Sequence, residues 1–201
     1  MKRRLLLSAT TLSSLALLGC VPLGGGDTPS RVWYVLEDAG TQATPVPASA
    51  RGLRVTGEPG SDFYESRALA FSRERATRAY FQYANWSESP AERIAQLFVT
   101  RLREGGAPAA PEARAMRLVL EDLYLDVTGD QAVVKLVIEA RLMPRQASEP
   151  GTAQVFRIDE PAQSADAPGM AQASGRALGR AFDAILGWLG GALKTAGSSG
   201  R

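Results

Sequence analysis

The chain has 201 residues, and its 23 basic and 21 acidic side chains nearly balance. This length suits one domain with a short extension, and the charge balance excludes the concentrated basic surface that nucleic-acid binding requires. The sequence has no histidine and one cysteine. These counts exclude zinc sites built from those ligands and remove the usual general base of catalysis. We therefore expect no nucleic-acid partner, no metal, no cofactor and no catalytic residue.

The first 20 residues have the pattern of a lipoprotein signal. A basic tip at 2–4 precedes an apolar run at 5–18, and Gly19 and Cys20 follow. A basic region, an apolar core and a small residue before the cut define a secretory signal. A cysteine directly after the small residue predicts that residues 1–19 are removed and that Cys20 is lipidated. The alternative is an ordinary signal or a membrane helix, but the run is shorter than the roughly 20 apolar residues that span a bilayer.

Residues 20–30 are small, polar and rich in glycine, a composition typical of a flexible tether. The ten residues that follow Cys20 span at most about 35 Å when fully extended. The folded part is therefore expected to stay within that distance of the membrane that holds its lipid.

The first half of the folded part is expected to contain strands joined by turns. The segment 38–51 has no periodicity and is expected to be a loop, and 58–66 is expected to be a turn that exposes Phe63 and Tyr64. Alternation and β-branched or aromatic residues mark the strands. The predicted strands of this half are 31–37, 52–57, 67–72 and 77–84.

A helix is predicted over 87–105, because Pro90 suits a first helical position and Ser89 with Glu92 forms a capping-box pattern. After it, the strands 116–127 and 131–142 form a long hairpin. The alternation of the first of these strands slips near Glu121 and Asp122, which predicts a β-bulge. A last strand is predicted over 153–158.

A second helix is predicted over 167–195, followed by a disordered tail at 196–201. One stripe of this helix is apolar. Four glycines interrupt the helix, and they either allow close packing on the sheet or fray its C-terminal end. They are Gly175, Gly179, Gly187 and Gly190.

Together these elements predict an α+β fold in a single domain at 31–195. About seven strands joined largely by tight turns favour one mostly antiparallel sheet. Each helix has a single apolar stripe, so both are expected to pack on a face of that sheet.

The order of these features resembles a known family. A lipoprotein signal is followed by the strand 32–36, a short strand with an aromatic turn, a strand that ends in Asn85 and Trp86, a helix that opens at Pro90, a long hairpin and an alanine-rich last helix with Trp188. This order is similar to that of the ABC-type transport auxiliary lipoproteins, which include the lipoprotein of the paraquat-inducible system. The similarity extends over nearly all of 20–195, although the 38–51 loop is longer and richer in proline than the family pattern.

The resemblance implies a non-enzymatic role beside an intermembrane lipid transporter built on MCE proteins. Such lipoproteins are expected to anchor at the periplasmic face of the outer membrane and to contact the MCE protein, either as one copy or as a ring of copies. Val21, next to Cys20, favours the outer membrane, because an aspartate there directs retention at the inner membrane in enterobacteria.

Four residues are candidates for partner binding. Phe63 and Tyr64 are adjacent aromatics in a predicted turn, and such residues are enriched where proteins meet. Arg67 belongs to a group of arginines near the hairpin that either meets an anionic lipid or an acidic partner or only solvates the turn. Trp86 is either a core residue or a partner-facing anchor. The sequence leaves two other functions open, namely a lipid-binding carrier and an envelope-assembly scaffold.

Overall fold

The computed structural model describes residues 30–40, 43–104, 114–144 and 151–198. The predicted signal, the tether up to residue 29 and residues 199–201 lie outside the described residues. The described fold belongs to one compact unit that begins at Arg31. In chain order its elements are β1 (Val32–Tyr34), the 3-10 turn η1 (Ala48–Ala50), β2 (Arg54–Pro59), the 3-10 turn η2 (Asp62–Tyr64), β3 (Ala68–Ser72), β4 (Ala79–Trp86), α1 (Pro90–Glu104), β5 (Ala115–Asp126), β6 (Val133–Leu142), β7 (Thr152–Pro161) and α2 (Ala167–Ser198).

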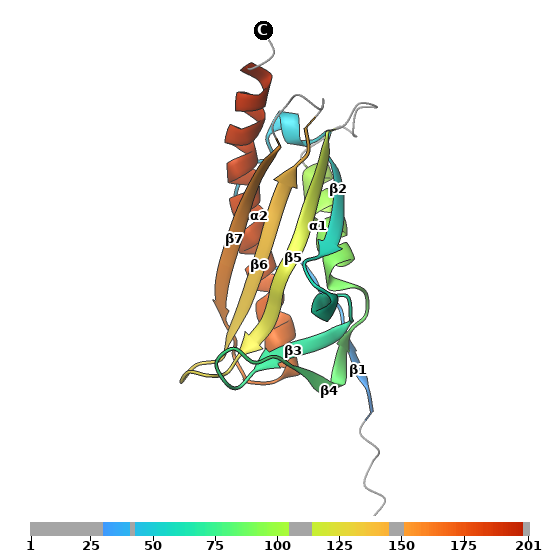
Figure 1. Ribbon diagram of the computed structural model, residues 1–201, viewed down its shortest axis with the longest axis vertical. Helices are drawn as coiled ribbons and strands as arrows, with labels where there is room; N and C mark the ends of the chain where they lie inside the picture. Colours follow the sequence, from blue (N-terminus) through green and yellow to red (C-terminus); the bar gives the residue numbers. More distant parts are fainter. Residues whose placement is uncertain (1–29, 41–42, 105–113, 145–150, 199–201) are drawn as a thin grey trace, which may run out of the picture. The chain divides into compact units, whose positions relative to one another are not determined.

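The seven strands form one mixed sheet with the order β1-β4-β3-β5-β6-β7, in which β2 also pairs with β5. The two long ladders, β5 with β6 and β6 with β7, are antiparallel, as is the β3–β4 hairpin. The pairings of β1 with β4, of β2 with β5 and of β3 with β5 are parallel. The predicted fold class, one sheet of seven strands with two helices, is confirmed (Figure 1).

Strand β5 organises the sheet because two strands share one of its edges. β2 runs beside its first half, as far as the pair Pro59 and Leu120, and β3 runs beside its last three residues. The predicted bulge is present, since the register with β6 shifts between Leu120 and Asp122. This shift lets Leu123 continue the buried face that Leu120 ends, and both side chains are almost fully buried.

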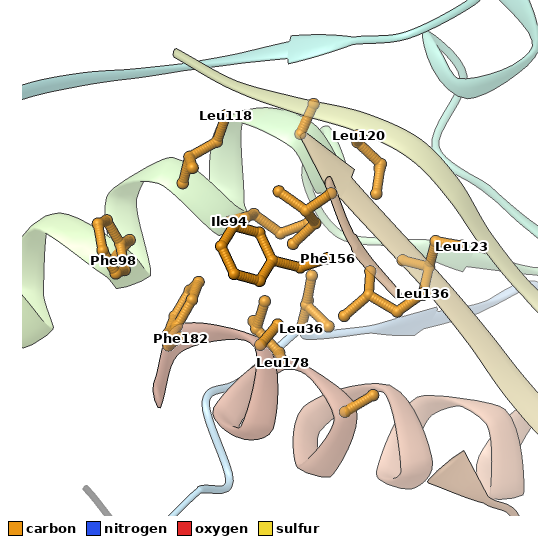
Figure 2. Close-up of a cluster of buried hydrophobic side chains, with 14 of the residues drawn as sticks. Leu36, Ile94, Phe98, Leu118, Leu120, Leu123, Leu136, Phe156, Leu178 and Phe182 are labelled. Atoms are coloured by element: carbon orange, nitrogen blue, oxygen red, sulfur yellow. The ribbon is translucent and has the colours of Figure 1, made fainter. Parts of the chain in front are cut away.

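Both helices pack on the same face of the sheet, which places the core between the two layers. α1 packs mainly on β2 and β5, and α2 packs on β6 and β7. Figure 1 shows both helices behind the sheet in that view. The ring centroids of Phe98 in α1 and Phe182 in α2 lie 5.0 Å apart, so the two helices pack on each other through these rings (Figure 2).

The predicted start of α1 agrees with the structure. Pro90 is its first residue, and the backbone N–H of Arg93 donates to the carbonyl of Ser89 at 2.9 Å. Proline suits this position because its missing N–H has no partner in the first turn. Ile94 and Phe98 lie one helical turn apart and are fully buried against the sheet.

The opposite face of the sheet carries charged side chains in pairs. Lys135 on β6 binds Asp159 on β7 at 2.5 Å, and Arg117 on β5 lies 3.4 Å from Glu58 on β2. These ion pairs join neighbouring strands on a wet surface, where each contributes little to stability. The face that the helices leave open therefore mixes these ion pairs with valines such as Val137 and Val155.

The segment predicted as a loop at 38–51 packs along α2. The backbone N–H of Ala39 donates to the carbonyl of Gly175, and the N–H of Thr44 donates to the carboxylate of Asp183. Gly179 lies against Gly40. We call this segment the strap (residues 37–40 and 43–47). Gly175 and Gly179 therefore allow α2 to approach the strap closely, whereas the sequence suggested that they allow approach to the sheet or fray the helix end.

The ends of most elements differ from the prediction by a few residues, and β1 (Val32–Tyr34) is four residues shorter than the predicted strand 31–37. β7 is ten residues long and not six, because every residue from Thr152 to Pro161 pairs with β6. α2 continues to Ser198, three residues beyond its predicted end. Composition does not show the extension of β7, since pairing with β6 sustains it.

Candidate functional site

The aromatic turn lies in a gap of the sheet, beside β5. β2 stops pairing at Leu120 and β3 begins to pair at Tyr124, so η2 occupies the space between them. The N–H of Gly60 donates to the carbonyl of Leu120 at 2.8 Å and fixes the entry to this turn. The bulge of β5 thus positions the two aromatic residues that the sequence singles out.

Tyr64 is not exposed, contrary to the prediction. Only 8% of the residue is accessible, and its hydroxyl donates to Asp122 at 2.7 Å. Burial, followed by the hydrogen bond to Asp122, raises the pKa of Tyr64 far above its ordinary value. The side chain is held as a neutral hydrogen-bond donor inside the fold, and a partner does not reach it without rearrangement.

Arg78 completes this partly buried polar group. Its guanidinium lies 3.4 Å from Asp122 and the same distance from the centroid of the Tyr124 ring. Burial opposes its charge, but the contacts with Tyr64, Tyr124 and Asp122 outweigh that effect and raise the pKa of Arg78. The group Tyr64, Arg78, Asp122 and Tyr124 fastens β4 and η2 to β5, which is a structural role.

Phe63 differs from its neighbour because it lies at the surface. Its ring stacks on that of Tyr80 with a centroid distance of 4.4 Å, and the Tyr80 hydroxyl donates to the carbonyl of Phe63 at 2.7 Å. Phe63 is half-buried and Tyr80 is exposed. The two rings form a rigid aromatic surface, which we call the aromatic shelf.

Arg67 and Trp86 have opposite environments. Trp86 is 2% accessible and belongs to the core, so the core alternative is correct for this residue. Arg67 is exposed, its guanidinium donates to the carbonyl of Ser87, and it lies 5.8 Å from the centroid of the Trp33 ring. Of the four candidates, Phe63 and Arg67 remain accessible in the structure. Tyr80 packs on Phe63, and Trp33 lies beside Arg67.

A second surface feature is a groove between β2 and α1. Its volume is about 520 Å³. Apolar and polar side chains both face it, whereas an acyl chain requires a mostly apolar lining. The lining residues are Val55, Thr56, Gly57, Glu92, Ala95, Gln96, Val99, Thr100 and Arg103.

In the part of the chain that the structure describes, no three or more acidic, cysteine or histidine side chains gather closely enough to hold a metal ion. No helix within those same residues has the length and apolar character needed to cross a bilayer.

Comparison with known families identifies the chain. The model of a family described as "ABC-type transport auxiliary lipoprotein component" matches residues 34–186, well over half of the sequence. The chain belongs to this family. The matched residues of this auxiliary lipoprotein run from the end of β1 into α2, and the aromatic shelf, the strap and the polar group around Tyr64 lie within them.

Solved structures share the fold of this auxiliary lipoprotein. The crystal structure of protein XCC0632 from Xanthomonas campestris, a DUF330 protein, matches with a TM-score of 0.67 at 15% identity, and the match covers 84% of this chain and 98% of that one. An uncharacterised protein matches with a TM-score of 0.56 at 8% identity, covering 79% and 99% of the two chains. No curated protein matches the sequence. At these identities the structural matches show the fold alone.

Proposed function

We propose that this auxiliary lipoprotein is anchored through lipidated Cys20 at the periplasmic face of the outer membrane. There it docks on the MCE-type protein of an ABC lipid transporter and catalyses no reaction. One observation carries the proposal: Gly19 and Cys20 end a basic and apolar leader directly before a domain of an auxiliary lipoprotein family.

The docking surface that we propose is formed by the aromatic shelf and Arg67. Aromatic and arginine side chains supply most of the binding energy at protein interfaces. The shelf is rigid before any partner arrives, because the ring stacking and the Tyr80 hydrogen bond already fix Phe63. Pre-organisation of this kind lowers the entropy lost on binding.

The two alternatives make different demands on the fold. A lipid carrier needs an enclosed apolar cavity, and the mixed lining of the groove between β2 and α1 gives that alternative little support. An envelope scaffold needs a docking surface as the adaptor does, so only the identity of the bound protein separates those two functions.

Capture of the transporter tests the proposal. Tagged mature lipoprotein is extracted in mild detergent from cells that contain their own transporter, and we expect the MCE protein to co-purify. Phe63→Ser and Arg67→Ser should each reduce the recovered MCE protein by about tenfold or more, as loss of an interface anchor does. Arg157→Ser, which removes an exposed arginine from β7, is the matched control and should leave recovery unchanged.

Thermal unfolding of each variant separates lost docking from lost folding. If Phe63→Ser unfolds the domain, Arg67→Ser still tests the surface because its side chain is exposed. Failure to recover any MCE protein through an intact tether contradicts the adaptor. Phospholipid that co-purifies at near one molecule per chain, with no protein partner, favours the carrier instead.

A further inference from the structure

The first strand of the domain and its neighbour β4 carry a second exposed apolar surface, which we call the β1 patch (Trp33, Val35 and Tyr83). We propose that the β1 patch rests on the headgroup region of the bilayer that holds the lipid of Cys20. This inference depends on the anchor in the proposed function, and it adds that the domain lies on the membrane through a defined face.

Large exposed apolar side chains gather at one place in the fold. Six large apolar side chains of the described residues are exposed, and three of them form the β1 patch. Trp33 and Val35 are each 51% accessible, whereas Tyr34 is half-buried and Leu36 is buried. This alternation shows that the strand presents one row to the core and the other to the surroundings.

The patch lies at the edge of the sheet. β1 is the terminal strand of the sheet order and pairs with β4, where Val32 lies opposite Ala84 and Trp33 opposite Asn85 (Figure 1). Val32 and its partner Ala84 point to the core side of the sheet, whereas Tyr83, one residue before Ala84, points to the same face as Trp33. The two strands thus bring an indole, a phenol and one valine to the same face at this edge.

The position of the patch in the sequence indicates what covers it. Ten residues separate Cys20 from Arg31, and they span at most about 35 Å. β1 is the first element after this tether, so the β1 patch is closer along the chain to the proposed lipid than any other part of the fold. A short tether gives a high effective concentration, which allows a weak surface contact to be occupied most of the time.

The chemistry of the patch suits a bilayer interface. Tryptophan and tyrosine are enriched at the headgroup level, where their rings are apolar and their N–H or O–H groups meet water. Arg31 is exposed directly before the strand, and a guanidinium binds phosphate well. Exposed Glu37 offsets one positive charge, so we expect the contact to depend mainly on the apolar rings.

Quenching of tryptophan fluorescence by brominated phospholipid tests this inference. The mature lipoprotein is reconstituted in vesicles of phosphatidylethanolamine and phosphatidylglycerol, with or without bromine on the acyl chains near the headgroup. The chain has three tryptophans, and Trp86 is buried while Trp188 packs on Phe156. Bromine should therefore remove about a third of the emission, the part from Trp33 at the interface.

Matched variants identify the residues involved. Trp33→Phe should abolish the quenchable part of the emission, and the double variant Val35→Ser with Tyr83→Ser should reduce quenching of Trp33. Val155→Ser removes an apolar side chain of similar exposure on β7, at the other end of the sheet order, and should change nothing. Near-native melting temperatures of the variants show that they fold.

Flotation of the vesicles separates this inference from the anchor on which it depends. If the lipoprotein floats and bromine leaves Trp33 emission unchanged, the β1 patch does not meet the bilayer and the inference is wrong while the anchor stands. If the lipoprotein does not float, the anchor fails and the inference fails with it. If Trp33 stays exposed to solvent in the presence of lipid but becomes protected when the captured partner is bound, the patch binds protein. The inference is overturned in that case as well.

Discussion

Arg101→Met should lower the free energy of unfolding by about 3–5 kcal/mol, the range found when one member of a buried ion pair is removed. Arg101 is 3% accessible, yet it lies in the last turn of α1 among core residues. Its guanidinium contacts both carboxylate oxygens of Asp38, at 2.5 and 2.6 Å, and lies 3.2 Å from Asp183. Methionine fills much of the same volume but leaves two partly buried carboxylates without their cation.

The expected loss of stability is large because of the segments that Arg101 connects. Besides the two carboxylates, the guanidinium donates to the carbonyls of Gly179 and Gly40. One side chain of α1 is therefore bonded to α2 and to the strap at once. Its loss should loosen the strap as well as weaken the packing between the helices.

Urea unfolding measures this difference. Arg103→Met is the matched control, because Arg103 is exposed two residues further along the same helix and should change stability by less than about 1 kcal/mol. The triple variant Arg101→Met, Asp38→Asn and Asp183→Asn should recover part of the loss, since it removes the stranded charges. A loss below about 1 kcal/mol for Arg101→Met would mean that the buried cluster contributes little.

Gly179→Ala and Gly187→Ala should shift stability in opposite directions although both lie within α2. A Cβ at Gly179 would lie 2.3 Å from the Cα of Gly40 and 2.6 Å from its nitrogen, and backbone atoms yield only if the strap moves. A Cβ at Gly187 would meet no atom within 4 Å. Alanine gains about 1 kcal/mol over glycine in a helix, and overpacking costs about 1–3 kcal/mol, so the clash decides the sign at Gly179.

Melting temperature gives the simplest comparison. We expect Gly187→Ala to raise the midpoint by about 2–4 °C, the shift that 1 kcal/mol gives in a chain of this size. Gly179→Ala should lower it, and hydrogen exchange of the N–H of Ala39, which donates to Gly175, should increase. Shifts of the same sign in both variants would contradict the close packing of the strap on α2.

Local patterns in the sequence predict much of this fold correctly. The proline at the start of α1, the apolar stripe of that helix and the alternation of the long hairpin each depend on neighbouring residues. The bulge near Asp122 is visible for the same reason, because a slip in alternation is itself local. Parallel pairing is different, since the strand that β2 joins lies beyond α1 and no local pattern selects it.

The candidate site shows the same limit. Tyr64 and Phe63 are adjacent in a turn, and only a hydrogen bond to Asp122, 58 residues away, draws Tyr64 inward. Trp33 is exposed because β1 is the edge strand, and strand order is not apparent from composition. The buried ion pairs of Arg101, by contrast, could be predicted from the sequence. Arg101 lies three residues after Phe98 and next to Leu102, and an arginine on the apolar stripe of a helix indicates a buried partner.

The intact mass of the mature chain tests most directly whether this domain works as a lipoprotein. We predict a chain that begins at Cys20 and is heavier by the diacylglycerol and an acyl group, and that sediments with the outer membrane. Cys20→Ser should release the protein into the periplasm. A mature chain that keeps residues 1–19 or carries an unmodified thiol at Cys20 would contradict the account.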